Sequence, residues 1–372
     1  MIETLFRILA LMRKELLVIL KDPRGRITLF VPPILQCLIF GYAATYDLSN
    51  VPYALVDHDR SAASRALAAR LDGSGIFSRI ATPEQTELAA AYLDNRRAVV
   101  IVVISRDFER NLNAGQPAPV QVIADGRNSN TAGIAQGYVG TVAATFGQEW
   151  RASHGLPGEA VRLTTRAWYN PSLETRWNMI PSLIGTITML MTMMLTAMSV
   201  AREREEGTFD QLLVAPFRPT EIMIGKAVPS MMVGIVQSTL IFLVALIWFR
   251  IPFAGSYAVL YLGLVLFLAA AIGIGLFLSS IAANMQQAMI LTFVLLMPFM
   301  LLSGLMSPAE NMPMALQYFT MINPLHYAIS ITREVYLEGA GLDQLLPDML
   351  ALVAIAAVTL PFAAWLFRNR LV

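Results

Sequence analysis

Charged residues and cysteines are both scarce in this chain of 372 residues. Asp, Glu, Lys and Arg make up only 14% of it, whereas about a quarter of a soluble globular protein is charged. Hydrophobic residues reach 56% and the mean hydropathy is +0.58, which favours an integral membrane protein. The single cysteine, Cys37, excludes a disulfide within the chain, so any domain outside the membrane must be held together by packing alone.

The chain also lacks a phosphate-binding loop of the form G-x-x-x-x-G-K-[ST]. The nearest approach to this motif is Gly225-Lys226. Thr220 stands where the first glycine is required, and Ala227 follows the lysine. The sequence therefore contains no nucleotide-hydrolysing motif of this type.

Six stretches are long and apolar enough to cross a bilayer, because a spanning helix needs roughly 20 mostly apolar residues. They are Ile27–Tyr46, Met179–Ala201, Ile222–Phe249, Tyr257–Ile281, Gln287–Leu305 and Leu346–Phe367. About 130 residues with the composition of a soluble domain separate the first stretch from the second. This order predicts an α-helical membrane protein with one plus five transmembrane helices and an inserted extracytoplasmic mixed α/β domain.

The predicted organisation has four parts. Residues 1–26 contain a basic amphipathic helix at Met1–Lys21, which is expected to lie in the membrane interface. Residues 27–46 form the first transmembrane helix, and residues 47–177 form the extracytoplasmic domain. Residues 178–372 form a five-helix transmembrane domain, interrupted on the cytoplasmic side by a charged segment at 201–219.

The distribution of Lys and Arg predicts the orientation, because positively charged flanks resist translocation. These residues precede the first span, follow the second and follow the last: Arg7, Arg13, Lys14, Lys21, Arg24, Arg26, Arg202, Arg204, Arg218, Lys226, Arg368 and Arg370. The loops after the third and fifth spans carry only Arg250 and Arg333. We therefore expect both termini in the cytoplasm and residues 47–177 in the periplasm.

The extracytoplasmic domain alternates short β-rich runs with helical patterns. The predicted strands are Tyr53–Val56, Ala98–Ile104, Val120–Ile123 and residues 161–168, and the predicted helices are Ser61–Leu71, Pro83–Leu93 and Thr131–Trp150. Ser61 and Thr82 are expected to cap two of these helices. The alternation predicts a small mixed α/β sheet.

The run Asp57-His58-Asp59 superficially suggests a metal site. Three consecutive side chains at a strand end diverge, however, so we interpret the run as a solvated turn in which Asp59 or Ser61 caps the next helix. We expect neither a catalytic residue nor a metal ligand in this domain.

The segment AREREEGTFDQLLVAPFRP at 201–219 has the most specific pattern in the chain. Five charged residues, Arg202 to Glu206, directly follow an apolar span. Gly207-Thr208 interrupts the helical pattern, and a second short amphipathic turn then ends at Pro216. A solvated helix end explains the charges but not this second turn.

Four stretches spread along the whole chain resemble one family. They are RKELLVILKDPR at Arg13–Arg24, VDHDRSAASR at Val56–Arg65, AREREEGTFDQLLVAPFRPTEIMIGK at Ala201–Lys226, and LLSGLMSPAENMP at Leu301–Pro313 with Asn323-Pro324 beyond it. With these motifs the chain resembles type-2 ATP-binding-cassette (ABC) exporter permeases, of the subgroup with a large periplasmic domain after the first span.

The resemblance implies a coupling role for the cytoplasmic segments. Met1–Lys21 would touch the ATPase, Arg202–Pro216 would receive its motion, and residues 307–339 would form two short re-entrant helices. The residues expected to couple to the ATPase are Lys14, Glu15, Asp22, Arg202, Glu203, Arg204, Glu205, Gly207 and Thr208. Charges displayed here would dock the partner, so reversing the charge of Glu203 or Glu205 is expected to uncouple hydrolysis from transport.

The implied function is export of a hydrophobic or amphiphilic compound, drug-like or lipid-like, across a bacterial inner membrane. The implied partners are an ABC ATPase subunit, a second copy or a similar permease, membrane lipid and an optional periplasmic adaptor protein, with no nucleic acid. ATP and Mg would bind to the ATPase, and this chain would hold no cofactor of its own.

The predicted spans contain almost no ionisable residues, which disfavours a path for ions or strongly charged sugars. The candidate path residues are Met191, Thr192, Met194, Gln237, Met300 and Ser303. Methionine is flexible and polarizable and suits a surface that accepts varied apolar ligands. Lipid-facing or helix-packing methionine explains the pattern equally well.

Two other functions stay open. Ser303 and His326 near the outer boundary suggest an intramembrane serine hydrolase, but no G-x-S-x-G motif surrounds Ser303 and no acidic residue is evident to orient the histidine. A non-transporting scaffold or receptor would use the periplasmic domain for binding and the spans for anchorage. Purification with or without a co-eluting ATPase distinguishes the scaffold from the exporter.

Overall fold

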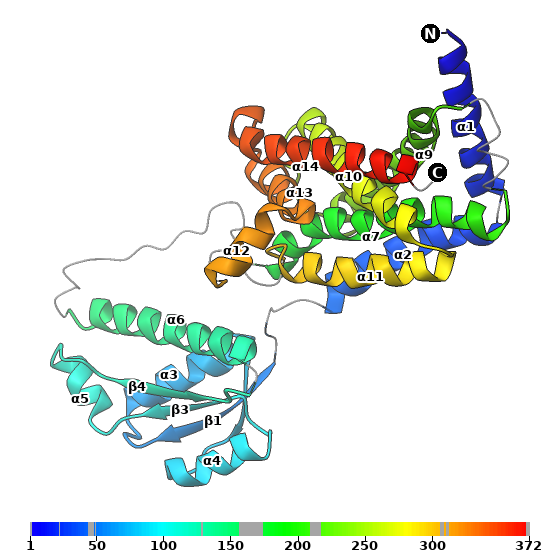
Figure 1. Cartoon of the computed structure of the whole chain (residues 1–372). Coiled ribbons are helices and arrows are strands. Elements are labelled where there is room, and N and C mark those ends of the chain that lie inside the picture. Colours follow the sequence, from blue (N-terminus) through cyan, green and yellow to red (C-terminus); the bar gives the residue numbers. More distant parts are fainter. Residues whose placement is uncertain are drawn as a thin grey trace. The chain divides into compact units, whose positions relative to one another are not determined.

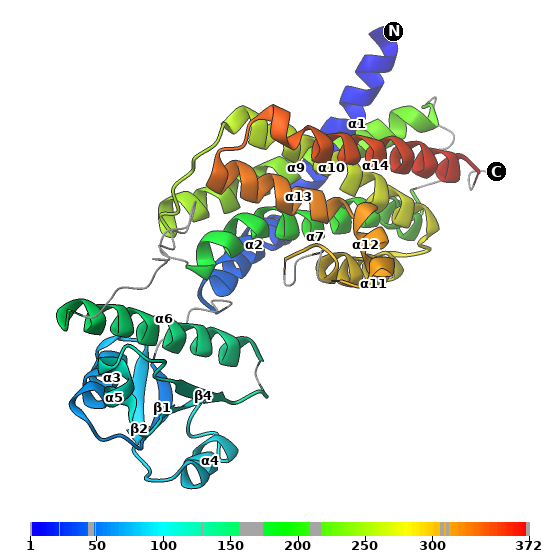
Figure 2. The same cartoon turned by 90° about the vertical axis from the view of Figure 1, so that its left-hand side faces the viewer.

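The computed structural model describes residues 2–21, 23–43, 48, 50–127, 129–155, 174–208, 217–305, 309 and 312–369. Residue contacts divide the chain into two compact units. The helical unit comprises Met1–Thr45 with Ala167–Val372, and the α/β unit comprises Tyr46–Arg166. Figures 1 and 2 show the helices of the first unit and the layered sheet of the second.

The described part of the helical unit is built from α-helices and two π-helical turns. Its elements are α1 (Ile2–Lys21), α2 (Pro23–Ala43), α7 (Thr175–Glu205), α9 (Pro219–Leu243) with a π-helical turn at Val244–Trp248, α10 (Tyr257–Ile281), α11 (Met285–Leu301), α12 (Met314–Met321), α13 (Pro324–Arg333) with a π-helical turn at Glu334–Glu338, and α14 (Leu342–Asn369). The short helices α12 and α13 fall within the predicted re-entrant segment 307–339. Helix α1 ends at Lys21, as predicted, and α2 begins at Pro23, four residues before the predicted start of the first span at Ile27.

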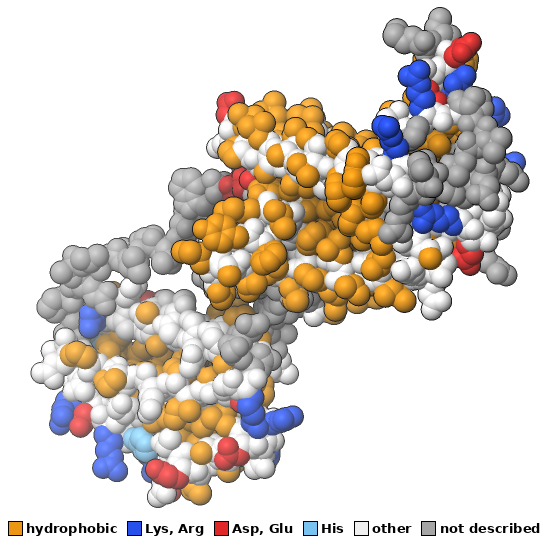
Figure 3. Space-filling model, viewed as in Figure 1, with side chains coloured by type: hydrophobic (Ala, Val, Ile, Leu, Met, Phe, Trp, Pro, Cys, Tyr) orange, Lys and Arg blue, Asp and Glu red, His pale blue; other side chains and the backbone are white. Residues whose placement is uncertain are grey.

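Four described helical segments are long and apolar enough to cross a membrane: Thr175–Glu205, Thr220–Trp248, Tyr257–Ile281 and Leu342–Asn369. Two shorter apolar helices, Leu29–Ala43 and Met285–Leu301, occupy the positions of the first and fifth predicted spans. Hydrophobic side chains cover most of the face of the helical unit shown in Figure 3, and Lys, Arg, Asp and Glu gather around the end near α1.

Helix α7 is the centre of the helical unit, because it contacts α2, α9, α10, α11 and α13. Its residues from Met179 to Met189 are buried on every side, as expected for a helix that is apolar all round. Two glycines of α10 allow close packing: a Cβ atom at Gly273 would lie 2.2 Å from Thr359 Oγ1, and one at Gly275 would lie 2.4 Å from Thr196 Oγ1. Both glycines therefore act as packing residues, which let α10 approach α14 and α7 closely.

The α/β unit contains a four-stranded sheet in the order β2-β1-β3-β4. The strands are β1 (Val51–Asp57), β2 (Phe77–Ala81), β3 (Val100–Ile104) and β4 (Val120–Ala124). Strand β1 is parallel to β2 and β3, whereas β4 is antiparallel to β3. Strand β2 was missed by the sequence analysis, and the predicted strand at 161–168 lies outside the described residues.

Helices cover both faces of this sheet (Figures 1 and 2). Helices α3 (Ala62–Gly73), α5 (Phe108–Asn113) and α6 (Ser129–Ser153) pack on one face, and α4 (Thr86–Asp94) packs on the other. Alternation along β1 produces this division, since Tyr53 and Leu55 face the first layer while Ala54 and Val56 face the second.

The two predicted helix caps in this unit have different outcomes. Ser61 caps α3, because its side chain accepts a hydrogen bond from Ser64 N. The predicted cap at Thr82 is wrong: α4 begins at Thr86, with the extended residue Gln85 at its N-cap. Residues 84–85 form a bend instead of a first helical turn, and in that bend Glu84 pairs with Arg60 at 3.0 Å.

Candidate functional site

Helix α1 packs against α9 beside the charged carboxyl-terminal end of α7. A Cβ atom at Gly225 of α9 would lie only 2.7 Å from Leu11 Cβ, so glycine permits this close approach. Leu11 and Ile19 of α1 are buried, whereas Leu5 and Phe6 near its start are exposed. The amphipathic stripe of α1 therefore serves partly as a contact surface within the chain.

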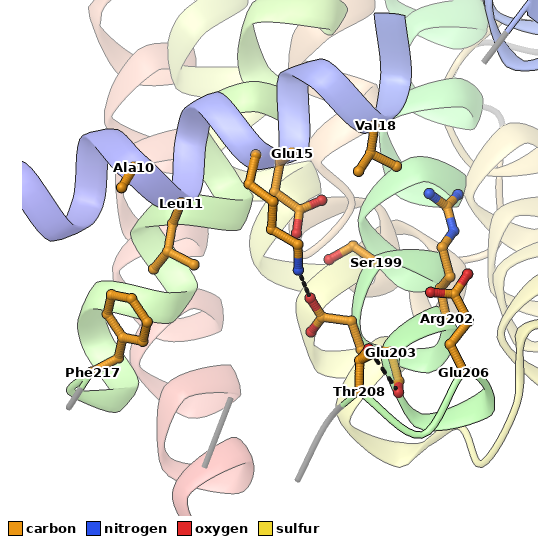
Figure 4. A pocket seen from close by; sticks show the side chains of 11 residues that line it. Ala10, Leu11, Glu15, Val18, Ser199, Arg202, Glu203, Glu206, Thr208 and Phe217 are labelled. Carbon is orange, nitrogen blue, oxygen red and sulfur yellow. Dashed lines mark hydrogen bonds and ion pairs between the residues drawn. The ribbon is translucent and has the colours of Figure 1, made fainter. Parts of the chain in front are cut away.

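Four charged residues from three helices form an ion-pair network at this junction: Lys14, Glu15, Glu203 and Lys226. Lys14 Nζ donates a hydrogen bond to Glu203 Oε1 at 2.7 Å (Figure 4). Lys226 Nζ donates to Glu15 Oε1 at 2.9 Å and to the Ser199 carbonyl at 3.2 Å. It also lies 3.0 Å from Glu203 Oε2, an ion pair without hydrogen-bond geometry.

The network is almost closed to solvent at its centre. The side chains of Lys226 and Glu203 are 2% and 6% exposed, Glu15 is 14% exposed, and Lys14, at 49%, is the most exposed of the four. A buried charge is costly to leave unpaired, and removing one partner of such a pair typically costs about 3–5 kcal/mol. The two positive charges of the lysines equal the two negative charges of the carboxylates. The network is therefore neutral as a whole, which lowers the cost of burying it.

Two opposing effects act on the pKa of Lys14. Its partial burial lowers the pKa, but the hydrogen bond and the charge of Glu203 outweigh that effect and raise the pKa above the ordinary value of 10.5. A raised pKa in the folded state means that the stabilisation is fully present below the unfolded-state pKa and is lost as the pH rises through the folded value. Lys14 therefore stays protonated, and this ion pair stays formed, at neutral pH.

A pocket of about 460 Å³ opens beside the network, between α1 and the end of α7. Figure 4 shows Glu203 and Arg202 from α7, Leu11 and Val18 from α1, and Phe217 converging on it. The pocket combines a charged wall with an apolar wall. This combination suits a side chain from a partner protein.

Gly207 ends α7 and does not kink a continuing helix. Its φ of +69° is the left-handed conformation that glycine adopts readily. Thr208 N donates to the Glu203 carbonyl at 3.0 Å and Gly207 N donates to the Arg204 carbonyl at 3.3 Å, the paired bonds of a Schellman cap. The second amphipathic turn predicted at 209–216 lies outside the described residues, as does Asp22.

Arg204 and Glu205 tie the end of α7 to the α10–α11 connection. Arg204 donates to the Ala282 carbonyl at 2.9 Å, just past the carboxyl end of α10. Glu205 Oε2 accepts from Met285 N at 3.0 Å, at the start of α11. Each charge has the sign that the adjacent helix dipole favours.

The structure changes the interpretation of the predicted coupling residues. Lys14, Glu15 and Glu203 lie together, but Glu203 is buried against the two lysines and is not displayed to a partner. Lys226 is not among the coupling residues predicted from the sequence. Its position within the apolar run IMIGKAVPS was the one available signal, since a lysine there requires a carboxylate partner.

The candidate path residues belong to different helix contacts. Thr192 meets Gly234 of α9, where a Cβ atom would lie 2.8 Å from its hydroxyl. Gln237 Nε2 donates to the Leu29 carbonyl of α2 at 2.8 Å. Ser303 donates to the Met300 carbonyl at 2.7 Å, at the end of α11. Met191 and Met194 are partly exposed on α7.

The geometry at Ser303 does not support a serine hydrolase. His326 Nδ1 lies 3.3 Å from the Ser303 carbonyl oxygen, and the Ser303 hydroxyl donates to Met300 instead. A serine nucleophile requires a base within hydrogen-bond reach of its hydroxyl. This pair instead helps to join α11 to α13.

The run Asp57-His58-Asp59 stabilises turns of the α/β unit. Asp57 accepts from Asp59 N, Arg60 N and Ser64 Oγ. Asp59 accepts from Phe108 N and Glu109 N and so caps α5. Of the two residues predicted as alternative caps of the next helix, Ser61 is the one that caps it. Burial of the Asp59 carboxylate raises its pKa. Hydrogen bonds from Ser61 and from these backbone groups have the larger combined effect, so the pKa lies below its ordinary value. Among the described residues, no three His, Cys, Asp or Glu side chains are grouped to hold a metal ion.

Comparison with known proteins assigns the family. Residues 24–365 match the family described as ABC-2 family transporter protein. The chain is 39% identical over 364 residues to "Probable multidrug ABC transporter permease YbhR" of Escherichia coli (strain K12), covering 98% of this chain and 99% of that protein. It is 30% identical over 370 residues to "Probable multidrug ABC transporter permease YbhS" of the same strain, covering 98% and 97%.

A third relative comes from a different bacterium. The chain is 24% identical over 390 residues to "Linearmycin resistance permease protein LnrN" of Bacillus subtilis (strain 168), covering 98% of this chain and 99% of that protein. The family match runs through both units of the structure, from the start of α2 into α14. The chain therefore belongs to the ABC-2 family of transporter permeases.

Proposed function

We propose that this chain is the membrane subunit of an exporter that moves a hydrophobic or amphiphilic compound, drug-like or lipid-like, out of the cytoplasm or the inner leaflet. ATP hydrolysis on a separate ABC ATPase subunit would drive the export, with ATP and Mg bound there and no cofactor on this chain. The names of two relatives, which mention multidrug transport and linearmycin resistance, support a drug-like substrate.

The ion-pair network carries this proposal. Lys14 and Glu15 anchor α1 to α7 and α9, and α9 itself contacts α7 directly. A force applied to α1 would therefore be transmitted directly to α7, which contacts five other helices of the bundle. The pocket beside the network offers a place where a partner could apply such a force.

The proposed topology places six spans in the inner membrane, with both termini cytoplasmic and the α/β unit periplasmic. The four long helices and the two shorter apolar helices would be these spans. The 17 residues of α11 rise only about 25 Å, slightly less than a hydrocarbon core of about 30 Å. The turn after Leu301 would supply the remaining length.

A second permease would complete the translocation path. Helix α11 exposes a row of large apolar side chains, Ile290, Phe293, Val294, Met297 and Leu301. Such a face suits lipid or another copy of the permease. A periplasmic adaptor would meet the α/β unit.

Reconstitution tests the proposed function. The full chain alone in liposomes is expected to export nothing, because its sequence carries no phosphate-binding loop. Liposomes that also contain the co-purifying ATPase should export a fluorescent amphiphilic drug when ATP is added. Export by the isolated chain would overturn the proposal, and purification without any ATPase would favour the scaffold function.

Methionines on α7 are expected to influence the substrate range. Replacing Met191 and Met194 by leucine keeps the side-chain volume but removes flexibility. The relative export rates of two drugs should change by roughly threefold or more, at unchanged expression. Met232→Leu, at an exposed methionine of α9 outside the α11 row, is the matched control and should leave the ratio unaltered. An unchanged ratio in the α7 variant would mean that these methionines only pack.

A further inference from the structure

A crevice in the α/β unit lies where the carboxyl ends of β1 and β2 diverge. The chain leaves β1 for α3 on one face of the sheet and leaves β2 for α4 on the other face (Figures 1 and 2). Ligands of open α/β sheets bind at such switch points, outside the carboxyl ends of the strands. The motif VDHDRSAASR at 56–65, which the coupling function does not use, contributes Asp57, Arg60 and Arg65 to the lining of this crevice.

The crevice has a volume of about 480 Å³, within the range of small-molecule sites. Three arginines line it: Arg60 after β1, Arg65 on α3 and Arg79 on β2. Its apolar lining comes from Leu55, Ala68, Ala69 and Pro83. The lining therefore combines guanidinium groups with a small apolar surface.

Arg65 is the cation that the surrounding structure leaves unneutralised. Arg60 pairs with Glu84 at 3.0 Å, and Arg79 pairs with Asp72 at 2.6 Å. Arg65 Nη1 donates only to the Arg60 carbonyl, at 3.0 Å, and no carboxylate of the described residues pairs with it.

The acidic residues that line the crevice do not supply the missing partner. Both oxygens of Asp57 already accept hydrogen bonds, from Asp59 N, Arg60 N and Ser64 Oγ. Glu84 is engaged by Arg60. An anion that entered the crevice would therefore meet Arg65 without displacing an existing ion pair.

We propose that this crevice binds the anionic group, a phosphate or carboxylate, of a small amphiphile, with Arg65 as its main contact. A planar guanidinium recognises such groups through two parallel hydrogen bonds. The apolar side chains would receive a short hydrocarbon part of the same ligand. This binding requires no ATPase, so it stands or falls independently of the export function.

Titration of the full chain in phosphatidylcholine nanodiscs tests the site. Hexyl phosphate is the probe, with inorganic phosphate and hexanol as comparison ligands and empty nanodiscs measured in parallel. Calorimetry should show hexyl phosphate binding more tightly than inorganic phosphate, and no saturable binding of hexanol. Hydrogen exchange should slow within residues 55–84, which form the crevice. Absence of hexyl phosphate binding would overturn the site, and equal affinity for both phosphates would overturn the amphiphile assignment.

Two matched variants locate the binding. Arg65→Gln should weaken hexyl phosphate binding by roughly tenfold or more, since a hydrogen bond to a charged group is lost. Arg110→Gln removes another exposed arginine, which lies outside the crevice and pairs with Asp107 at 3.2 Å. This variant should bind hexyl phosphate with the wild-type affinity. Equal affinities in the two variants would show that hexyl phosphate binds elsewhere.

Discussion

Glu203→Lys is expected to disrupt the junction of α1, α7 and α9. The change places a third ammonium group beside Lys14 and Lys226, where the wild-type carboxylate lies 2.7 Å and 3.0 Å from their nitrogens. Loss of one partner in a buried pair costs about 3–5 kcal/mol, and the added repulsion increases that cost. The unfolding midpoint, followed by fluorescence-detected size exclusion after heating, should fall by on the order of 10 °C.

Two further variants separate the effect of burial from that of charge alone. Glu206→Lys makes the same change of charge on an exposed residue three positions later and should leave the midpoint within a few degrees. The unfolding midpoint of Glu203→Gln should lie between those of Glu203→Lys and Glu206→Lys. The amide oxygen still accepts a hydrogen bond from Lys14, but a neutral amide cannot balance the positive charge of Lys226. If Glu203→Lys were as stable as Glu206→Lys, the ion-pair network would not be a structural element.

Gly225→Ala is expected to lower ATP-driven export by about tenfold or more while the chain still inserts and folds. The new Cβ would lie 2.7 Å from Leu11 Cβ, which is fixed to the backbone of α1 and cannot turn aside. Helix α1 must therefore move away from α9, and the ion pairs of Lys14 and Glu15 would lengthen. Export and ATP hydrolysis measured on the same proteoliposomes should show hydrolysis that no longer drives transport.

A compensating change tests whether this contact is the cause. Leu11→Gly removes the atom that the new Cβ would strike, so Leu11→Gly combined with Gly225→Ala should recover a large part of the export. The recovery will be incomplete, because glycine within a helix costs about 1 kcal/mol relative to alanine. Normal export by Gly225→Ala alone would show that the position of α1 does not control coupling.

Most of the architecture could be predicted from the sequence, because it depends on local pattern. Three of the four strands and the long apolar helices follow from short-range periodicity and hydropathy. Strand β2 was missed because it is an edge strand in which only Phe77 is buried. The sequence FSRIA does not by itself predict a strand, because its β conformation depends on pairing with the neighbouring strand β1.

The site was predicted less completely, because its contacts join distant parts of the chain. The family motifs pointed to Lys14, Glu15 and Glu203, but Lys226, the partner of both carboxylates, lies 211 positions from Glu15. The burial of Glu203 among four other consecutive charged residues could not be read from local composition. Only the docking of α1 on α9 determines which of these charges faces inward.

The docking of α1 also has a consequence for synthesis of the protein. Lys14 and Glu15 leave the ribosome first, yet the chain must grow by another 211 positions before Lys226 exists to meet Glu15. At translation rates of about 5–20 residues per second, this interval lasts roughly 10–40 s. Throughout it, Leu11 has no α9 to cover it. Helix α1 must therefore lie on the bilayer surface or be bound by a chaperone until α9 has been synthesised.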